Sequence, residues 1–71
     1  MAEETRKRLP DIIDSIDELR DEVNRFYEAE VEEMREKEMD HFTALAAASD
    51  ARSLFNAYAS LDDAANILAN F

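Results

Sequence analysis

The chain contains no glycine and no cysteine, and Pro10 is its only proline. Glycine supplies the positive-φ residues that tight β-hairpins need, so its absence argues against a sheet and favours an all-α fold. Without cysteine the chain has neither disulfides nor thiolate metal sites, which is typical of proteins from a reducing cytoplasm. Alanine, glutamate, leucine and arginine, all strong helix formers, are abundant instead.

Basic residues and long apolar runs are also scarce. Eight lysines and arginines stand against 18 acids, which gives a net charge of −10. This charge repels nucleic acids and anionic membranes, so we expect no direct binding to either. The longest apolar run is residues 44–48, far below the roughly 20 residues that span a bilayer, and the acidic start lacks the apolar segment of a secretory signal. We therefore expect a soluble, cytoplasmic protein.

The sequence offers no catalytic constellation. It has no cysteine nucleophile, and none of its serines lies in a nucleophile-elbow motif. It also has no glycine to shape an oxyanion hole or a phosphate-binding loop. We expect a non-enzymatic protein without a cofactor.

The stretch from Asp11 to Phe42 dominates the chain, because it has no glycine or proline and its apolar residues recur at helical spacing. Pro10 suits the first turn of a helix, where its missing N–H costs nothing. We predict a flexible segment over 1–9 and a single helical domain over 10–71. That domain begins with one long amphipathic helix over about 10–48.

The predicted long helix ends at Ser49–Asp50, a pair with helix-capping chemistry, and Thr43 is a second candidate for the break. Short helices over 50–59 and 61–70 then fold back along the long one, giving a helical hairpin or a small bundle. A single helix over 50–70 is the alternative, because its apolar residues keep helical spacing throughout.

An apolar stripe runs along the first half of the long helix, in two rows whose residues recur every seven positions. Gaps that alternate between three and four are typical of a coiled-coil or bundle seam. With the apolar residues after position 50, the predicted core or interface comprises Ile12, Ile13, Ile16, Leu19, Val23, Phe26, Tyr27, Leu54, Phe55, Tyr58, Leu61 and Leu68. The stripe fits both an intramolecular core and an interface with another chain.

The length of the helix favours self-association. Residues 11–42 would span about 48 Å, whereas a compact chain of this size is only about 28 Å across. The outer part of such a helix must project into solvent or pack on another chain. We therefore expect a homo-oligomer, with a dimer as the first possibility.

The second half of the long helix is acidic. Its predicted partner surface comprises Glu28, Glu30, Glu32, Glu33, Glu36, Glu38 and Asp40. Ion pairs four residues apart, Asp21–Arg25 and Glu33–Lys37, support the helix. This surface either keeps the assembly soluble or meets a basic partner.

An acidic helix can also imitate the phosphate backbone of a nucleic acid. Between positions 11 and 40 there are 13 acids and 4 bases. That is about one net charge per 5 Å of helix, against one per about 1.7 Å in duplex DNA, so only a dimer approaches the density of DNA.

Glu38 and His41 form a Glu-x-x-His pair, which on a helix places both side chains on one face, as in di-metal carboxylate proteins. A metal site would need a second copy of this pair from another chain. The sequence thus predicts an interaction or assembly module that self-associates or binds a protein partner through its apolar stripe. Inhibition of a nucleic-acid-binding protein by mimicry is the alternative, and a metal site is the third.

Overall fold

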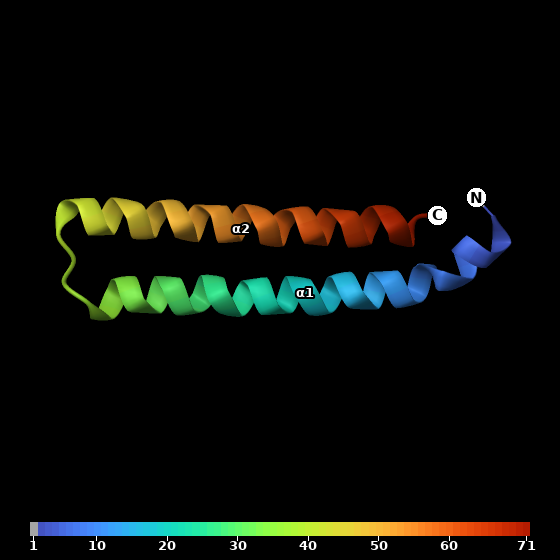
Figure 1. The fold of residues 1–71 in the computed structure, drawn as a ribbon, viewed down its shortest axis with the longest axis horizontal. Helices are drawn as coiled ribbons and strands as arrows, with labels where there is room; N and C mark the ends of the chain where they lie inside the picture. The colour runs from blue at the N-terminus through green and yellow to red at the C-terminus, as the bar shows by residue number, and fades with distance from the viewer. Residues whose placement is uncertain (1) are drawn as a thin grey trace.

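Two antiparallel helices form the part of the chain that the computed structural model describes, residues 2–71. Helix α1 spans Glu3–Glu36, helix α2 spans His41–Ala69, and residues 37–40 link them. The hairpin is a rod of 55 × 15 × 13 Å, with both termini at one end and the link at the other (Figure 1). The all-α helical hairpin expected from the sequence is confirmed.

Helix α1 begins earlier than the predicted start at position 10. Glu3 and Glu4 occupy its first turn, where the helix dipole favours acidic side chains. Pro10 therefore lies inside the helix, where it lacks an N–H and crowds the preceding turn. Figure 1 shows the first turns of α1, in dark blue, bent away from the axis of the rest, as an internal proline explains.

The break between the helices also differs from the prediction. It falls at residues 37–40, so the predicted helix over 10–48 is in fact divided between α1 and α2. Lys37 and Asp40 both have extended backbone angles, and no described residue has a positive φ. The Asp40 carboxylate accepts a 2.7 Å hydrogen bond from the Thr43 backbone N–H, which caps the start of α2.

The predicted break at Ser49–Asp50, and the predicted division near position 60, are wrong. Helix α2 is continuous through both, so residues 50–69 form one helix, as in the alternative left open by the sequence, but that helix begins at His41. Alanine has the highest helix propensity of any residue and fills much of this region, and the apolar spacing never changes register.

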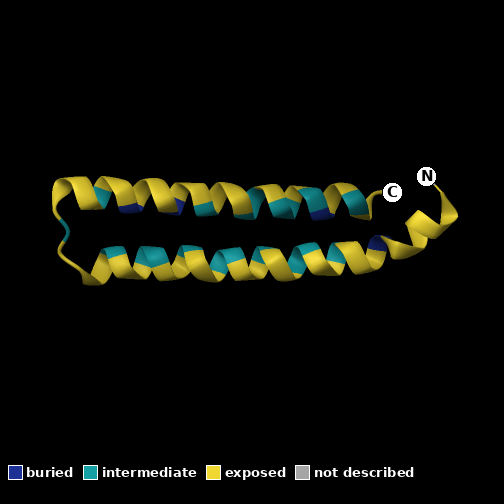
Figure 2. Ribbon diagram, in the orientation of Figure 1, coloured by how far each residue is buried: buried dark blue, intermediate teal, exposed yellow. Residues whose placement is uncertain are grey.

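The seam between the helices follows a heptad pattern, which on α1 shifts by one position after Tyr27. On each helix, the half-buried and buried residues that face the other helix are separated by three or four positions (Figure 2). On α1 they are Leu9, Ile13, Ile16, Arg20, Val23, Tyr27, Val31 and Met34, and on α2 they are Ala44, Ala47, Ala51, Leu54, Tyr58, Leu61, Ala65 and Leu68. Of the described residues, only Leu9, Ala47, Ala51 and Ala65 are buried, each with 6–8% of its surface exposed.

The hairpin is not a compact domain. Its radius of gyration is 16.5 Å, whereas a compact chain of this length would have about 11 Å. The assumption of a domain about 28 Å across is therefore wrong, because α2 runs beside α1 along the rod instead of covering one part of it. Self-association must be argued from exposed surface rather than from an overhanging helix.

Candidate interaction surfaces

The predicted apolar stripe divides into two groups in the structure. Eight of its members are half-buried in the seam: Ile13, Ile16, Val23, Tyr27, Leu54, Tyr58, Leu61 and Leu68. The other four are exposed: Ile12, Leu19, Phe26 and Phe55. The predicted stripe thus lies partly in the seam and partly on the exposed surface.

Ile12, Leu19 and Phe26 form an exposed row along one side of α1. They are spaced by seven residues, and their exposed fractions are 41%, 51% and 64%. The row lies beside the seam of α1. Because the two helices are antiparallel, turning from the seam in the same direction about each helix axis, as viewed from each N-terminus, leads to the same side of the hairpin. On α2 that rotation reaches Ala57 and Ala64, so small side chains face the exposed row across the seam.

We call these five residues, Ile12, Leu19, Phe26, Ala57 and Ala64, the apolar face. The next heptad positions toward the link are Glu33 on α1 and Asp50 on α2. These acids bound the apolar face at the link end of the rod. The apolar face itself carries no charge.

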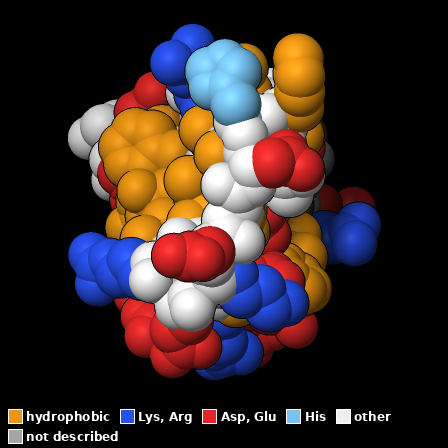
Figure 3. Space-filling view, turned by 90° about the vertical axis from the view of Figure 1, so that its left-hand side faces the viewer, with side chains coloured by type: hydrophobic (Ala, Val, Ile, Leu, Met, Phe, Trp, Pro, Cys, Tyr) orange, Lys and Arg blue, Asp and Glu red, His pale blue; other side chains and the backbone are white. Residues whose placement is uncertain are grey.

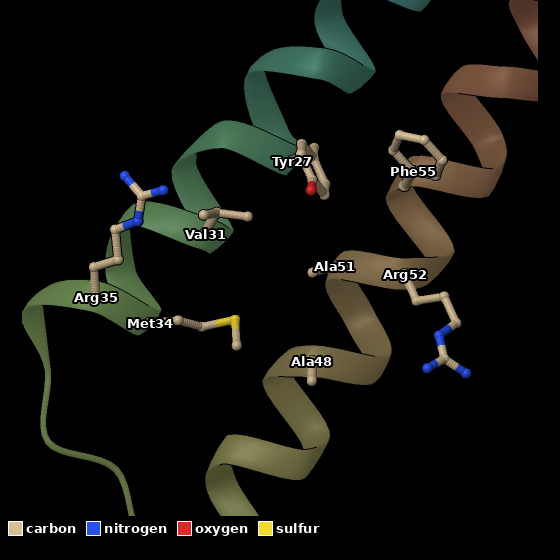
Figure 4. Close-up of a pocket in the computed structure, with 8 residues that line it drawn as sticks. All are labelled: Tyr27, Val31, Met34, Arg35, Ala48, Ala51, Arg52 and Phe55. Atoms are coloured by element: carbon tan, nitrogen blue, oxygen red, sulfur yellow. The ribbon is translucent and has the colours of Figure 1, made fainter.

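The opposite flank of the hairpin contains a hollow of about 650 Å³ near the link. Tyr27 and Phe55 meet across it, with ring centroids 5.8 Å apart and planes inclined by 54°. Figure 4 shows Val31 and Met34 extending from α1 toward α2, and Ala48 and Ala51 opposite them. We call this hollow the aromatic groove. Figure 3, viewed from the link end, shows hydrophobic side chains at the surface of that end of the rod.

Two arginines border the aromatic groove, Arg35 from α1 and Arg52 from α2. Figure 4 shows both side chains extending away from its apolar floor, on opposite sides. Both are exposed, and neither forms an ion pair with any described residue. Positive charge therefore borders this part of the surface, although the chain as a whole is acidic.

Arg20 lies in the seam and joins the two helices. Its Nη1 atom donates a 3.0 Å hydrogen bond to the Asp62 carboxylate on α2 and lies 3.3 Å from the Asp17 carboxylate. The hydrogen bond to Asp62 raises the pKa of the Arg20 guanidinium above its ordinary value. Its Nε atom is covered and has no hydrogen-bond partner, because the nearest Asp21 oxygen is 3.6 Å away.

This cluster was not predicted from the sequence, although Arg20 lies at a seam position between Ile16 and Val23, where an apolar residue would be expected. The predicted Asp21–Arg25 pair is absent from the ion pairs of the described residues, and Asp21 lies beside Arg20 instead. The predicted Glu33–Lys37 pair is present at 2.6 Å, and its hydrogen bond lowers the pKa of Glu33.

The predicted acidic surface does not lie on one continuous helix. Glu28, Glu32, Glu33 and Glu36 are exposed on α1, whereas Glu30 is half-buried. Glu38 and Asp40 belong to the link, where Asp40 caps α2. The hydrogen bond from the Thr43 backbone N–H lowers the pKa of Asp40.

The Glu38–His41 pair does not share a helix face. Glu38 lies in the link and His41 is the first residue of α2. Within residues 2–71, no three histidine, aspartate or glutamate side chains are grouped so that they could hold a metal ion. The helical premise of the third alternative, a metal site, is therefore wrong.

Neither helix described here combines the length with the apolar character needed to cross a membrane. No protein-family model, curated protein or solved structure matches the chain. Function is therefore argued from the apolar face, the aromatic groove and the charges around them.

Proposed function

We propose that this chain is a non-enzymatic assembly module that forms a homodimer, in which two hairpins pack their apolar faces together as a four-helix bundle. The observation that supports this proposal is the amount of apolar surface that one hairpin leaves open. Leu19 and Phe26 are each more than half exposed at heptad positions that, in bundles, contact a neighbouring helix.

The accessible area supports the same proposal. The hairpin exposes 5648 Å², whereas a compact monomer of its mass would expose about 4,500 Å². The excess of about 1,100 Å² exceeds the roughly 800 Å² that each partner buries in an interface of standard size. A second copy packed on the apolar face would bring the exposed area into the ordinary range.

A dimer built this way also places its charges favourably. The apolar face carries no charge, and most of the 18 acids lie on other parts of α1. The two chains still repel each other, because each has a net charge of −10. Added salt shortens the Debye length and so screens this repulsion. Salt should therefore strengthen the proposed dimer.

Sedimentation equilibrium of the full chain tests the proposal. We expect a mass of twice 8.2 kDa at micromolar concentration, and a mass of 8.2 kDa for the Leu19→Asp/Phe26→Asp double variant. Phe42→Asp is the matched control, because Phe42 is 81% exposed but lies outside the apolar face, so its mass should equal that of the unchanged chain.

Circular dichroism of the same samples separates dissociation from unfolding, and the milder Phe26→Ser variant serves if the double variant loses its helices. A helical wild-type monomer at micromolar concentration would refute the proposal. So would a dimer that both substitutions leave intact.

Mimicry of a nucleic acid by the acidic part of α1 is the competing proposal. It predicts capture of a basic, nucleic-acid-binding protein that weakens steeply with added salt, since screening removes charge attraction. The dimer proposed here should instead tighten with salt. Neutralising the exposed acids Glu28, Glu32, Glu33 and Glu36 should abolish mimicry and strengthen the dimer.

A further inference from the structure

The aromatic groove differs in charge from the rest of the molecule. The chain carries 18 acids against 8 lysines and arginines. Yet among the described residues, Arg35 and Arg52 are the only charged ones that line the groove, one from each helix. Since neither arginine is engaged in an ion pair with a described residue, their guanidinium groups remain available to a carboxylate.

The composition of the groove is that of a protein-binding site. Tyr27 and Phe55 present aromatic rings, Met34 presents an adaptable thioether, and two arginines flank them. Tyrosine and arginine dominate the energetics of protein interfaces, and methionine lets an apolar surface repack around different partners.

The shape of the groove favours a helix as its occupant. It lies between two antiparallel helices, and a third helix, about 10–12 Å in diameter, packs naturally along such a furrow. Arg35 and Arg52 extend on opposite sides of the apolar floor (Figure 4). The complementary helix therefore carries one apolar row with carboxylates on both sides of it.

We propose that the aromatic groove is a docking site for an acidic amphipathic helix of a different protein. Its apolar row covers Tyr27 and Phe55, and its carboxylates accept hydrogen bonds from Arg35 and Arg52. This site lies on the flank opposite the apolar face, so it goes beyond the proposed homodimer. A dimer would present two such grooves and could join two copies of the partner.

Two synthetic peptides of about 18 residues, long enough to form a helix, test the site. One carries a leucine row flanked by glutamates, and its twin carries lysines in place of every glutamate. Fluorescence anisotropy with the full chain should show about tenfold tighter binding of the glutamate peptide, with a preference that shrinks as salt is added. Equal binding of both peptides, or binding of neither, would overturn the proposal.

Charge reversal locates the site. In the Arg35→Glu/Arg52→Glu variant the preference should invert, so that the lysine peptide binds more tightly. Arg25→Glu is the matched control, because Arg25 is exposed on α1 and does not line the groove, so the glutamate preference should persist. A preference that survives reversal of both groove arginines would contradict the proposed site.

Sedimentation separates this inference from the proposed dimer. The Arg35→Glu/Arg52→Glu variant should keep the mass of the unchanged chain, because neither arginine belongs to the apolar face. If reversal lowers that mass, the groove is occupied by a second copy and the inference fails. If the unchanged chain is monomeric yet binds the glutamate peptide, the inference stands and the dimer fails.

Discussion

Asp40 determines where the second helix begins. Its carboxylate accepts the 2.7 Å hydrogen bond from the Thr43 N–H, and it follows three residues that take no helical structure. An N-cap of this kind satisfies one of the donors that every helix leaves open at its start. The same contact lowers the pKa of Asp40 below its ordinary value of 3.8.

Stability should therefore depend on the ionisation of Asp40. Because the pKa is lower in the folded chain than in the unfolded chain, the contribution is fully present above pH 3.8 and is lost as the pH falls below it. We expect Asp40→Ala to lower the melting temperature by a few degrees at pH 7. The gap between this variant and the unchanged chain should narrow toward pH 2, as measured by circular dichroism.

Asp40→Asn is the control for this titration. Asparagine caps helices about as well as aspartate but carries no titratable group. The difference in melting temperature between Asp40→Asn and Asp40→Ala should thus be the same at pH 7 and pH 2. A gap between Asp40→Ala and the unchanged chain that does not change with pH would show that the cap does not titrate.

Arg20 is a second residue whose role depends on the fold. Its side chain is only 25% exposed, and its partner Asp62 lies 42 positions away. Sequence periodicity places Arg20 in the seam, but nothing in the local pattern identifies Asp62 among 18 acids as its partner. Long-range pairing of this kind depends on the register of the two helices, which the position of the link determines.

At the scale of one element, α2 is distinguished by small residues in its seam. Ala47, Ala51 and Ala65 are its buried residues. Alanines at these positions leave no bulk between the helices, so the larger side chains of α1 can pack close to the α2 backbone.

Enlarging one of these alanines should strain the seam. We expect Ala65→Leu to destabilise the hairpin by about 1–3 kcal/mol, because Ala65 is buried away from the aromatic groove and the added atoms have no space to fill. Thermal melting followed by circular dichroism measures this change. Ala46→Leu adds the same atoms at an exposed position of α2 and should change stability little; equal effects of the two would mean that the seam is not tightly packed.

The helices themselves were largely predictable, and the link between them was not. Helix propensity and apolar spacing predict the all-α hairpin, and eight of the twelve predicted stripe residues lie in the seam. Residues 37–40, however, contain no glycine or proline, and Glu38 and Met39 are good helix formers. The break arises from the Asp40 cap and from the pairing of α2 with α1, which local propensity does not encode.

At the scale of the whole molecule, the hairpin is a thin rod with a continuous seam and two open flanks. The sequence predicted which residues are apolar, but their division into seam, apolar face and aromatic groove depends on the rotation of each helix about its axis. That rotation results from contacts between distant residues, such as Tyr27 with Phe55. Both proposals follow from this division.

The short link has a consequence for the kinetics of folding. Closing a chain loop costs more conformational entropy as the loop lengthens, so the residue pairs nearest residues 37–40 can form first. We expect Met34→Ala, near the link, to slow folding, and Leu68→Ala, near the open end, mainly to speed unfolding, as stopped-flow φ-values would show. Equal φ-values would contradict this order.

Folding that proceeds from the link implies an order for unfolding as well. The end that carries both termini (Figure 1) forms last and opens first, and the Arg20–Asp62 pair lies on the path of that opening. Amide hydrogens near the link should accordingly exchange most slowly with solvent. We therefore expect the two helices to separate progressively from the end with the termini toward the link.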